Sequence, residues 1–403
     1  MSGTRRIGGN LLLLAVGTGL GLALLEVGAR VVLSKRRPGG TGEQALYTMG
    51  DPVLGWRNRP GATLTFRRRE YETKVLINRL GFRDIERTVA RPADRPRVLI
   101  LGDSFIEAYA VERDEGVTRR IEALANEAGC PVDVVNAGVH AYSIDQEFLW
   151  YQRESAAMAP DLVVMAVYYN DIINTVRGNY WGSPKPVLEL RGGDLVPVNT
   201  PLPVPPDSSL TMAVAPRAAR PIAGSALRKI VLERLLAGAP RFYERLAGLG
   251  LVERYGTVAV ADELRVYKVK GELLEIDEAW KRTRDIVDAF VRIARERKAT
   301  PVLAYVPARF EVVDADWDLT KLQYSMNPSA WDRFVVARKL TRLAVQAGLP
   351  LLDFTDDLRA ATGLLKGSPY FQYDGHWNVR GNDIAARSTV NFLRNRRLLP
   401  CGI

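Results

Sequence analysis

A chain of 403 residues, 47% hydrophobic and 25% charged, is long enough for one large domain with insertions or for two ordinary domains. Its 34 Gly and 23 Pro do not reach the bias of a disordered polypeptide. The formal net charge of +10 indicates an anionic partner such as lipid headgroups, acidic polysaccharide or nucleic acid, but no aromatic-basic nucleic-acid module accompanies it. The two cysteines, Cys130 and Cys401, have no zinc-type spacing, and a disulfide and two free thiols are both open.

The N-terminus contains an uncharged, mostly apolar run over residues 7–25 that follows two arginines. This run is about long enough to cross a bilayer, so residues 1–33 are predicted to form a single membrane anchor with its flanks. A signal peptide cleaved near residues 27–29 and a buried soluble helix are the alternatives. The Gly-rich, basic stretch 34–46 then has the composition of a linker.

The folded part is predicted to begin with a β-rich lead-in over residues 47–96, where short alternating segments are broken by Gly and Pro. From residue 97 onwards, apolar runs typical of buried strands alternate with amphipathic segments typical of helices. The predicted strands are 98–101, 132–136, 162–167, 301–306 and 349–353, and the predicted helices are 112–129, 146–158, 278–297 and 330–347. This alternation predicts an α/β domain over 97–403 with a parallel sheet and helices on both faces.

A long insertion, from about 179 to 277, separates the third and fourth predicted strands. It opens with a hairpin signal around Gly192-Gly193 and continues with two basic amphipathic segments, 226–237 and 241–249. Three roles are open for this insertion: shaping access of a substrate, lying on a membrane, or packing on the domain as a structural cap.

Gly102-Asp103-Ser104 follows the first strand of the domain and places a serine hydroxyl at its carboxyl end. Open α/β sheets bind ligands at this edge, which makes Ser104 a candidate nucleophile. Taken alone, the same tripeptide is an ordinary strand-to-helix turn with capping residues.

The chain has only two histidines, His140 and His376, so few residues can serve as the base. His376 lies near the C-terminus, just before a predicted helix, and Asp374 stands two residues earlier, close enough to orient the imidazole. His140 follows the second strand and is the rival base. Its alternative interpretation is an ordinary loop histidine without a catalytic role.

Two further strand ends offer donors for the negative charge that develops during acyl transfer. Gly138 follows the second strand, and without a Cβ its backbone N–H can approach a reacting oxygen. Asn170 follows the third strand, and its amide is a neutral, fixed donor. Each residue alone is also a common turn or capping residue.

Gly102-Asp103-Ser104, Gly138, Asn170-Asp171 and Asp374/His376, in this order, resemble the SGNH/GDSL hydrolase superfamily over roughly residues 97–395. The anchor and the lead-in resemble a membrane-anchored bacterial branch of it. The resemblance implies a flavodoxin-like three-layer α/β/α fold and a serine mechanism without metal or cofactor. It implies Ser104 as nucleophile, His376 as base and then acid, Asp374 as its orienter, and an oxyanion hole from the Ser104 and Gly138 amides with the Asn170 side chain.

The sequence departs from the family pattern in two places. Tyr168 stands two residues before Asn170, where the family usually has Gly, and this predicts a narrower pocket. The family usually places the last Asp three residues before its His, but that position is Tyr373 and the nearest carboxylate is Asp374. Either Asp374 still reaches the ring, or a backbone carbonyl supports the histidine in a dyad.

Together these features predict a single-pass membrane-anchored esterase whose catalytic domain is extracytoplasmic, in the periplasm. O-acyl groups, O-acetyl above all, on cell-surface or exported polysaccharide are the expected substrates, and the membrane is the expected partner of the anchor. A polysaccharide O-acyltransferase and a lipase or thioesterase share the same predicted site. A non-catalytic glycan-binding or assembly protein is the alternative from a different class.

Overall fold

The structure is a computed structural model. It describes residues 16–31, 47–68, 70–180, 182–204, 262–324, 326–363 and 367–399, together with individual residues between 225 and 252. The chain divides into two units, one formed by residues 1–40 with 215–257 and the other by 41–214 with 258–403.

In the smaller unit, residues 16–31 form a helix with largely exposed apolar side chains, among them Leu20 and Leu24. Glu26 on this helix accepts hydrogen bonds from Ser225 Oγ and Leu227 N, at 2.8 and 2.9 Å. Residues 7–15 of the predicted anchor lie outside the described residues. Within the part of the chain that the structure describes, none of the helices has both the length and the apolar character that a bilayer span needs.

The larger unit is built on a five-stranded sheet with the order β13-β12-β7-β5-β6, in which all neighbours are parallel. The strands are β5 (Arg97–Gly102), β6 (Asp133–Gly138), β7 (Leu162–Val167), β12 (Thr300–Tyr305) and β13 (Leu351–Asp353). In chain order this arrangement is 2-1-3-4-5, the flavodoxin-like order, which confirms the predicted α/β fold with a parallel sheet. The order reverses between β5 and β7, and ligand sites of open sheets lie at such switch points.

The helices of this unit follow the predicted alternation with the strands. They are α2 (Ser104–Glu107), α3 (Val117–Glu127), α4 (Ile144–Glu154), α5 (Tyr169–Asn174), α8 (Leu274–Glu296), α9 (Arg309–Val312), α10 (Asp314–Gln323), α11 (Val335–Ala347), α12 (Thr355–Ala360) and α13 (Val379–Asn395). Short 3-10 helices are η2 (Arg113–Glu115), η3 (Ser155–Met158) and η4 (Asp262–Tyr267).

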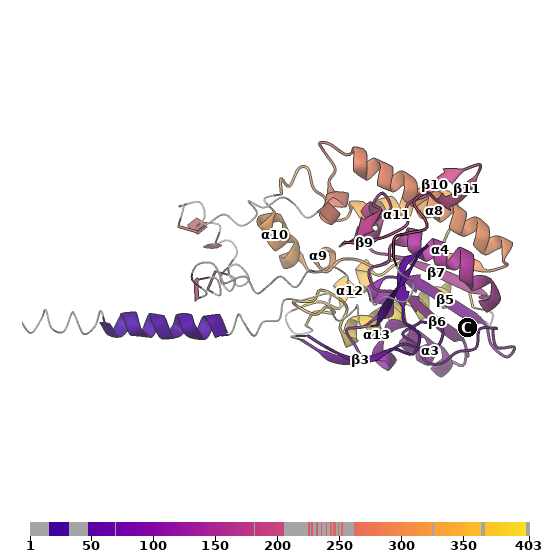
Figure 1. Cartoon of the computed structure of the whole chain (residues 1–403), viewed down its shortest axis with the longest axis horizontal. Coiled ribbons are helices and arrows are strands. Elements are labelled where there is room, and N and C mark those ends of the chain that lie inside the picture. The colour runs from indigo at the N-terminus through magenta and orange to yellow at the C-terminus, as the bar shows by residue number, and fades with distance from the viewer. Residues whose placement is uncertain are drawn as a thin grey trace, which may run out of the picture. The chain divides into compact units, whose positions relative to one another are not determined.

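Two apolar layers sandwich the sheet, because successive strand residues point to opposite faces. Leu99 and Leu101 of β5 pack with α4, α8 and α11, whereas Val98 and Ile100 pack with α2, α3 and α13. Figure 1 shows α4, α8 and α11 on one side of the strands and α3 and α13 on the other. This three-layer arrangement places the carboxyl ends of β5, β6 and β7 along one edge.

The insertion predicted over 179–277 begins with two short antiparallel pairs. They are β8 (Asn179–Tyr180) with β9 (Ser183–Pro184), and β10 (Leu188–Arg191) with β11 (Asp194–Pro197). Gly192 and Gly193 both have positive φ, which a two-residue hairpin turn of type I′ requires, so the predicted hairpin is confirmed. The segments 226–237 and 241–249 are described only at individual residues, and α8 begins inside the predicted insertion.

The lead-in forms two antiparallel hairpins, as its alternating pattern predicts. These are β1 (Thr48–Asp51) with β2 (Gly55–Asn58), and β3 (Thr63–Arg67) with β4 (Glu72–Leu76).

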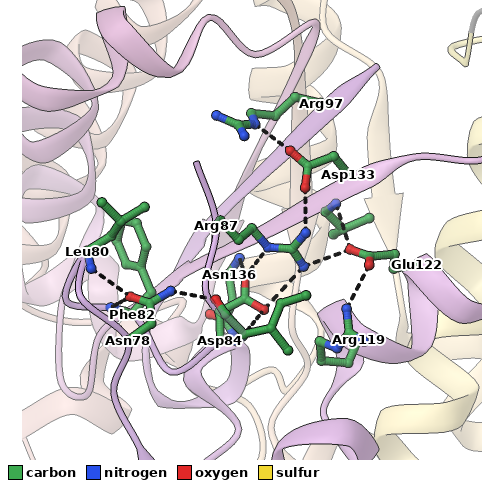
Figure 2. Close-up of polar contacts among 12 residues, drawn as sticks. Asn78, Leu80, Phe82, Asp84, Arg87, Arg97, Arg119, Glu122, Asp133 and Asn136 are labelled. Carbon is green, nitrogen blue, oxygen red and sulfur yellow. Dashed lines mark hydrogen bonds and ion pairs between the residues drawn. The ribbon is translucent and has the colours of Figure 1, made fainter. Parts of the chain in front are cut away.

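A buried ion-pair network joins the end of the lead-in to the sheet (Figure 2). The Arg87 guanidinium, 5% exposed, contacts the carboxylates of Asp84, Glu122 and Asp133 at 2.7, 2.7 and 2.5 Å. Asp133 at the start of β6 also pairs with Arg97 at the start of β5, at 2.7 Å. These contacts fix the lead-in against β5, which ends two residues before Ser104, and against β6, which ends at Gly138.

Candidate active site

The turn between β5 and α2 presents the candidate nucleophile. A Cβ on Gly102 would lie 2.2 Å from the Ile106 side chain, so only glycine lets α2 pack this closely onto the strand. Asp103 caps the helix by accepting a hydrogen bond from Phe105 N at 2.9 Å. Ser104 is therefore held, 6% exposed, at the switch point of the sheet.

Ser104, His376 and Asp374 form a continuous hydrogen-bonded relay. Ser104 Oγ lies 2.7 Å from His376 Nε2, and His376 Nδ1 lies 2.6 Å from Asp374 Oδ1. The imidazole ring packs against Phe105 at a tilt, with ring centroids 4.7 Å apart, and meets Tyr109 edge to face at 5.0 Å. This packing presents Nε2 to the serine and Nδ1 to the carboxylate.

The loop that carries Asp374 and His376 is a tight hairpin, and its shape explains the two-residue spacing. Tyr370 and Trp377 form an isolated bridge, and Phe371 N–H donates to the His376 carbonyl at 2.9 Å. Gly375 turns the chain with φ +84, a left-handed value that glycine adopts without strain. As a result the Asp374 side chain folds back onto the ring two residues later.

The negative charge of Asp374 and the positive charge of protonated His376 stabilise each other. Burial opposes ionisation of Asp374, but the neighbouring His376 charge and the hydrogen bonds from His376 and Tyr71 lower the pKa of the carboxyl to about 2. Burial disfavours a charged imidazole, yet the Asp374 carboxylate outweighs it and raises the pKa of His376. The site therefore stabilises the imidazolium that would form when the ring accepts the serine proton.

The predicted oxyanion donors lie at the same sheet edge, and one of them is already engaged. Gly138 is the last residue of β6, and its N–H donates to Asn136 Oδ1 at 2.9 Å, so the expected free donor is not free in this structure. A Cβ there would lie 2.3 Å from Glu107 N, so the glycine is required by the approach of α2.

The other two predicted donors each keep a hydrogen without an acceptor among the described residues. Asn170 Nδ2 donates one hydrogen to Tyr180 Oη at 3.1 Å and retains a second. Ser104 N–H has no hydrogen-bond acceptor among the described residues.

His140, the rival base, is buried and separated from the relay by Tyr109. Its ring lies 5.5 Å from Tyr109, and neither ring nitrogen has a partner among the described residues. Burial lowers the pKa of His140 to about 3, with the His376 charge adding to the effect. An imidazole with so low a pKa is a weak base, and His140 has no contact with Ser104, so it is a poor candidate for the base.

Three residues of the site are not predicted from the sequence. Tyr71 Oη donates to Asp374 Oδ2 at 2.8 Å, and Tyr109 Oη lies 3.2 Å from His376 Nδ1. Glu70 accepts backbone hydrogen bonds from the loop that carries Asp374. No motif marks these residues, because their roles depend on a contact about 300 residues apart in the chain. Among the described residues, no group of three or more potential metal ligands is present.

Comparison with solved structures gives distant likenesses. TesA is 12% identical over 75% of this chain and 99% of its own, with a TM-score of 0.37. The acetyl xylan esterase AlAXEase is 13% identical over 73% and 98%, with a TM-score of 0.38. A catalytic mutant of Axe2, an acetylxylan esterase from Geobacillus stearothermophilus, is 12% identical over 74% and 94%, with a TM-score of 0.37.

No protein-family model matches the chain, and no curated protein matches it. At these identities and TM-scores the likenesses carry no weight for the function.

Proposed function

We propose that this protein is a serine esterase that hydrolyses O-acyl esters through an acyl-enzyme. The observation that carries the proposal is the relay from Ser104 Oγ through both nitrogens of His376 to Asp374, with steps of 2.7 and 2.6 Å. A nucleophile, a base and an orienting carboxylate in this order are the elements of nucleophilic acyl transfer.

In the proposed mechanism, His376 Nε2 takes the Ser104 proton as the serine oxygen attacks the ester carbonyl. The resulting oxyanion accepts hydrogen bonds from Ser104 N–H and Asn170 Nδ2, while Asp374 stabilises the imidazolium. The imidazolium then protonates the departing alkoxide, which leaves as an alcohol. Water, deprotonated by the same nitrogen, attacks the acyl-enzyme and releases the carboxylic acid and free Ser104.

The aromatic residues around Ser104 favour a short acyl group such as acetyl. Tyr168 occupies the position where the family usually has glycine, and its ring lies 4.8 Å from Phe105, which in turn packs against His376. We propose that these rings border the site of the acyl group and exclude a long acyl chain. This observation favours an O-acetyl esterase over a lipase.

The setting of the enzyme is part of the same proposal. The apolar run 7–25 supports a membrane anchor, and a disulfide at Cys130 suits an oxidising compartment such as the periplasm. The net charge of +10 suits an acidic, O-acetylated surface or exported polysaccharide.

Acyl-length preference and acetate release test this function together. Wild type should hydrolyse p-nitrophenyl acetate faster than the octanoate and release acetate from an O-acetylated polysaccharide. Ser104→Ala should lose turnover, and Ser329→Ala, at an exposed serine, should keep it. Tyr168→Ala should move the preference towards longer chains. An inactive wild type would overturn the esterase proposal, and transfer of acetyl to a glycan hydroxyl in place of water would identify a transferase.

A further inference from the structure

The turn of the β3–β4 hairpin contacts the loop that carries Asp374 and His376. The partly buried Glu70 carboxylate accepts three backbone hydrogen bonds, from the N–H groups of Gln372, Tyr373 and Asp374, at 2.7, 2.7 and 3.0 Å. Both carboxylate oxygens take part. Charge-assisted bonds of this kind are stronger than neutral ones, and three consecutive amides fixed on one anion leave the backbone little freedom.

The next residue of the turn reaches the catalytic carboxylate itself. Tyr71 Oη donates to Asp374 Oδ2 at 2.8 Å, while Asp374 Oδ1 is the atom that meets His376. The Tyr71 ring packs on Phe371, with centroids 4.8 Å apart. Each oxygen of Asp374 therefore has its own partner, and the carboxylate cannot rotate without losing one of them.

The hairpin also supports Tyr109, the second hydroxyl close to the imidazole. Phe66 of β3 meets Tyr109 edge to face at 5.1 Å, and Thr73 Oγ1 of β4 donates to the Tyr109 carbonyl at 2.7 Å. Phe66 and Tyr109 belong to one small buried apolar cluster. One structural element thus supports the residues on the Nδ1 side of His376.

These contacts compensate for the position of Asp374 in the sequence. With only Gly375 between Asp374 and His376, the loop alone does not fix where the carboxylate points. The three amide groups bonded by Glu70 include that of Asp374 itself. The hairpin supplies the constraint that the short loop lacks.

We propose that Glu70 and Tyr71 are positioning residues that hold the Asp374 carboxylate against His376, so that the lead-in is a component of the active site. This inference rests on the proposed serine esterase function. Displacement of a catalytic group by about 1 Å costs on the order of 100-fold in rate, so loss of either residue should reduce kcat more than it changes KM.

Several ionisable groups surround His376 and affect how the activity depends on pH. Asp374, Asp103 and Glu107 all raise the pKa of His376. His140 stays neutral above a pKa of about 3, and Tyr109 contributes a hydroxyl. Asp374 raises the pKa of His376 more than the other groups do. Weakening the contact between Asp374 and His376 should therefore move the acid limb of kcat/KM to lower pH.

The test compares Glu70→Gln and Tyr71→Phe with Glu72→Gln on the same hairpin. Glu72 is exposed and pairs with Arg67 at 3.1 Å, so its variant should match wild type. Glu70→Gln and Tyr71→Phe should each lower kcat about 10- to 100-fold, with KM within about threefold. Glu70→Gln should also shift the acid limb downwards.

A double-mutant comparison separates positioning from a general structural role. In an Asp374→Asn background, Glu70→Gln and Tyr71→Phe should have little further effect on kcat, because both act through that carboxylate. Additive losses, or kcat values equal to that of Glu72→Gln, would overturn the proposal. Thermal unfolding identifies a variant that fails to fold, and the other variant then carries the test. Failure of the esterase function itself would differ, since wild type would then not react with a fluorophosphonate.

Discussion

Replacing Asp374 with Asn removes the charge from the relay while keeping its shape. The pKa of the Asp374 carboxyl falls from its ordinary 3.8 to about 2 in the folded protein, against the effect of burial. One pKa unit corresponds to 1.36 kcal/mol, so the contacts of this carboxylate favour its charged form by about 2 kcal/mol. If the transition state keeps that interaction with the imidazolium, its loss lowers kcat/KM by at least about 30-fold.

The loss should exceed this minimum, because an Asn amide facing Nδ1 favours the imidazole tautomer that cannot accept the serine proton. Replacement of a triad carboxylate by an amide costs about 10⁴-fold in the best-studied serine proteases.

The pH dependence of kcat/KM tests this prediction independently, through the direction in which the acid limb moves. Catalysis needs neutral His376, whose pKa lies above the ordinary 6.5, so wild-type kcat/KM should fall as pH drops through an apparent pKa above 6.5. Without the carboxylate, burial remains and the limb should move to lower pH. Initial rates on p-nitrophenyl acetate from pH 5 to 9 measure both effects. A variant within threefold of wild type, with the same acid limb, would refute a catalytic role for Asp374.

Three further predictions follow from burial and packing. His376→Ala should abolish turnover, whereas His140→Ala should leave kcat/KM within about tenfold, and the reverse result would move the base to His140. Gly138→Ala should destabilise the protein by about 1–3 kcal/mol, because the new Cβ would lie 2.3 Å from a backbone nitrogen of α2; a thermal melt unchanged from wild type would contradict this. Arg87→Ala should cost about 3–5 kcal/mol in urea unfolding because it leaves the buried Asp84 carboxylate without its ion pair, whereas Arg95→Ala on the surface should leave the midpoint unchanged.

The sheet is predictable from the sequence because its strands are buried on both faces. Such strands are continuous apolar runs, and the predicted strand 162–167 coincides with β7. Glycines at strand ends were also informative, since Gly102 and Gly138 are both required where α2 approaches the sheet. The pairing of Ser104 with His376 was predictable because the chain has only two histidines. It was also predictable because parallel strands bring their carboxyl ends to one edge of the sheet.

The geometry around Asp374 is not predictable in the same way. Its approach to His376 depends on a left-handed turn at Gly375 and on contacts with Glu70 and Tyr71, which no local pattern links to the C-terminal loop. The hydrogen bond from Gly138 N–H to the Asn136 side chain is likewise not predictable, because a strand pattern does not show which acceptor a backbone N–H will find. These parts of the site depend on side-chain contacts, which the pattern of secondary structure does not determine.

Covalent labelling of Ser104 tests the central claim most directly. A fluorophosphonate reacts with a serine only when a base activates its hydroxyl, as His376 would at 2.7 Å. We predict stoichiometric labelling of wild type at the peptide that contains Ser104, none in Ser104→Ala, and at least about 100-fold slower labelling in His376→Ala. An unlabelled, folded wild type, or a label that persists in Ser104→Ala, would contradict the account.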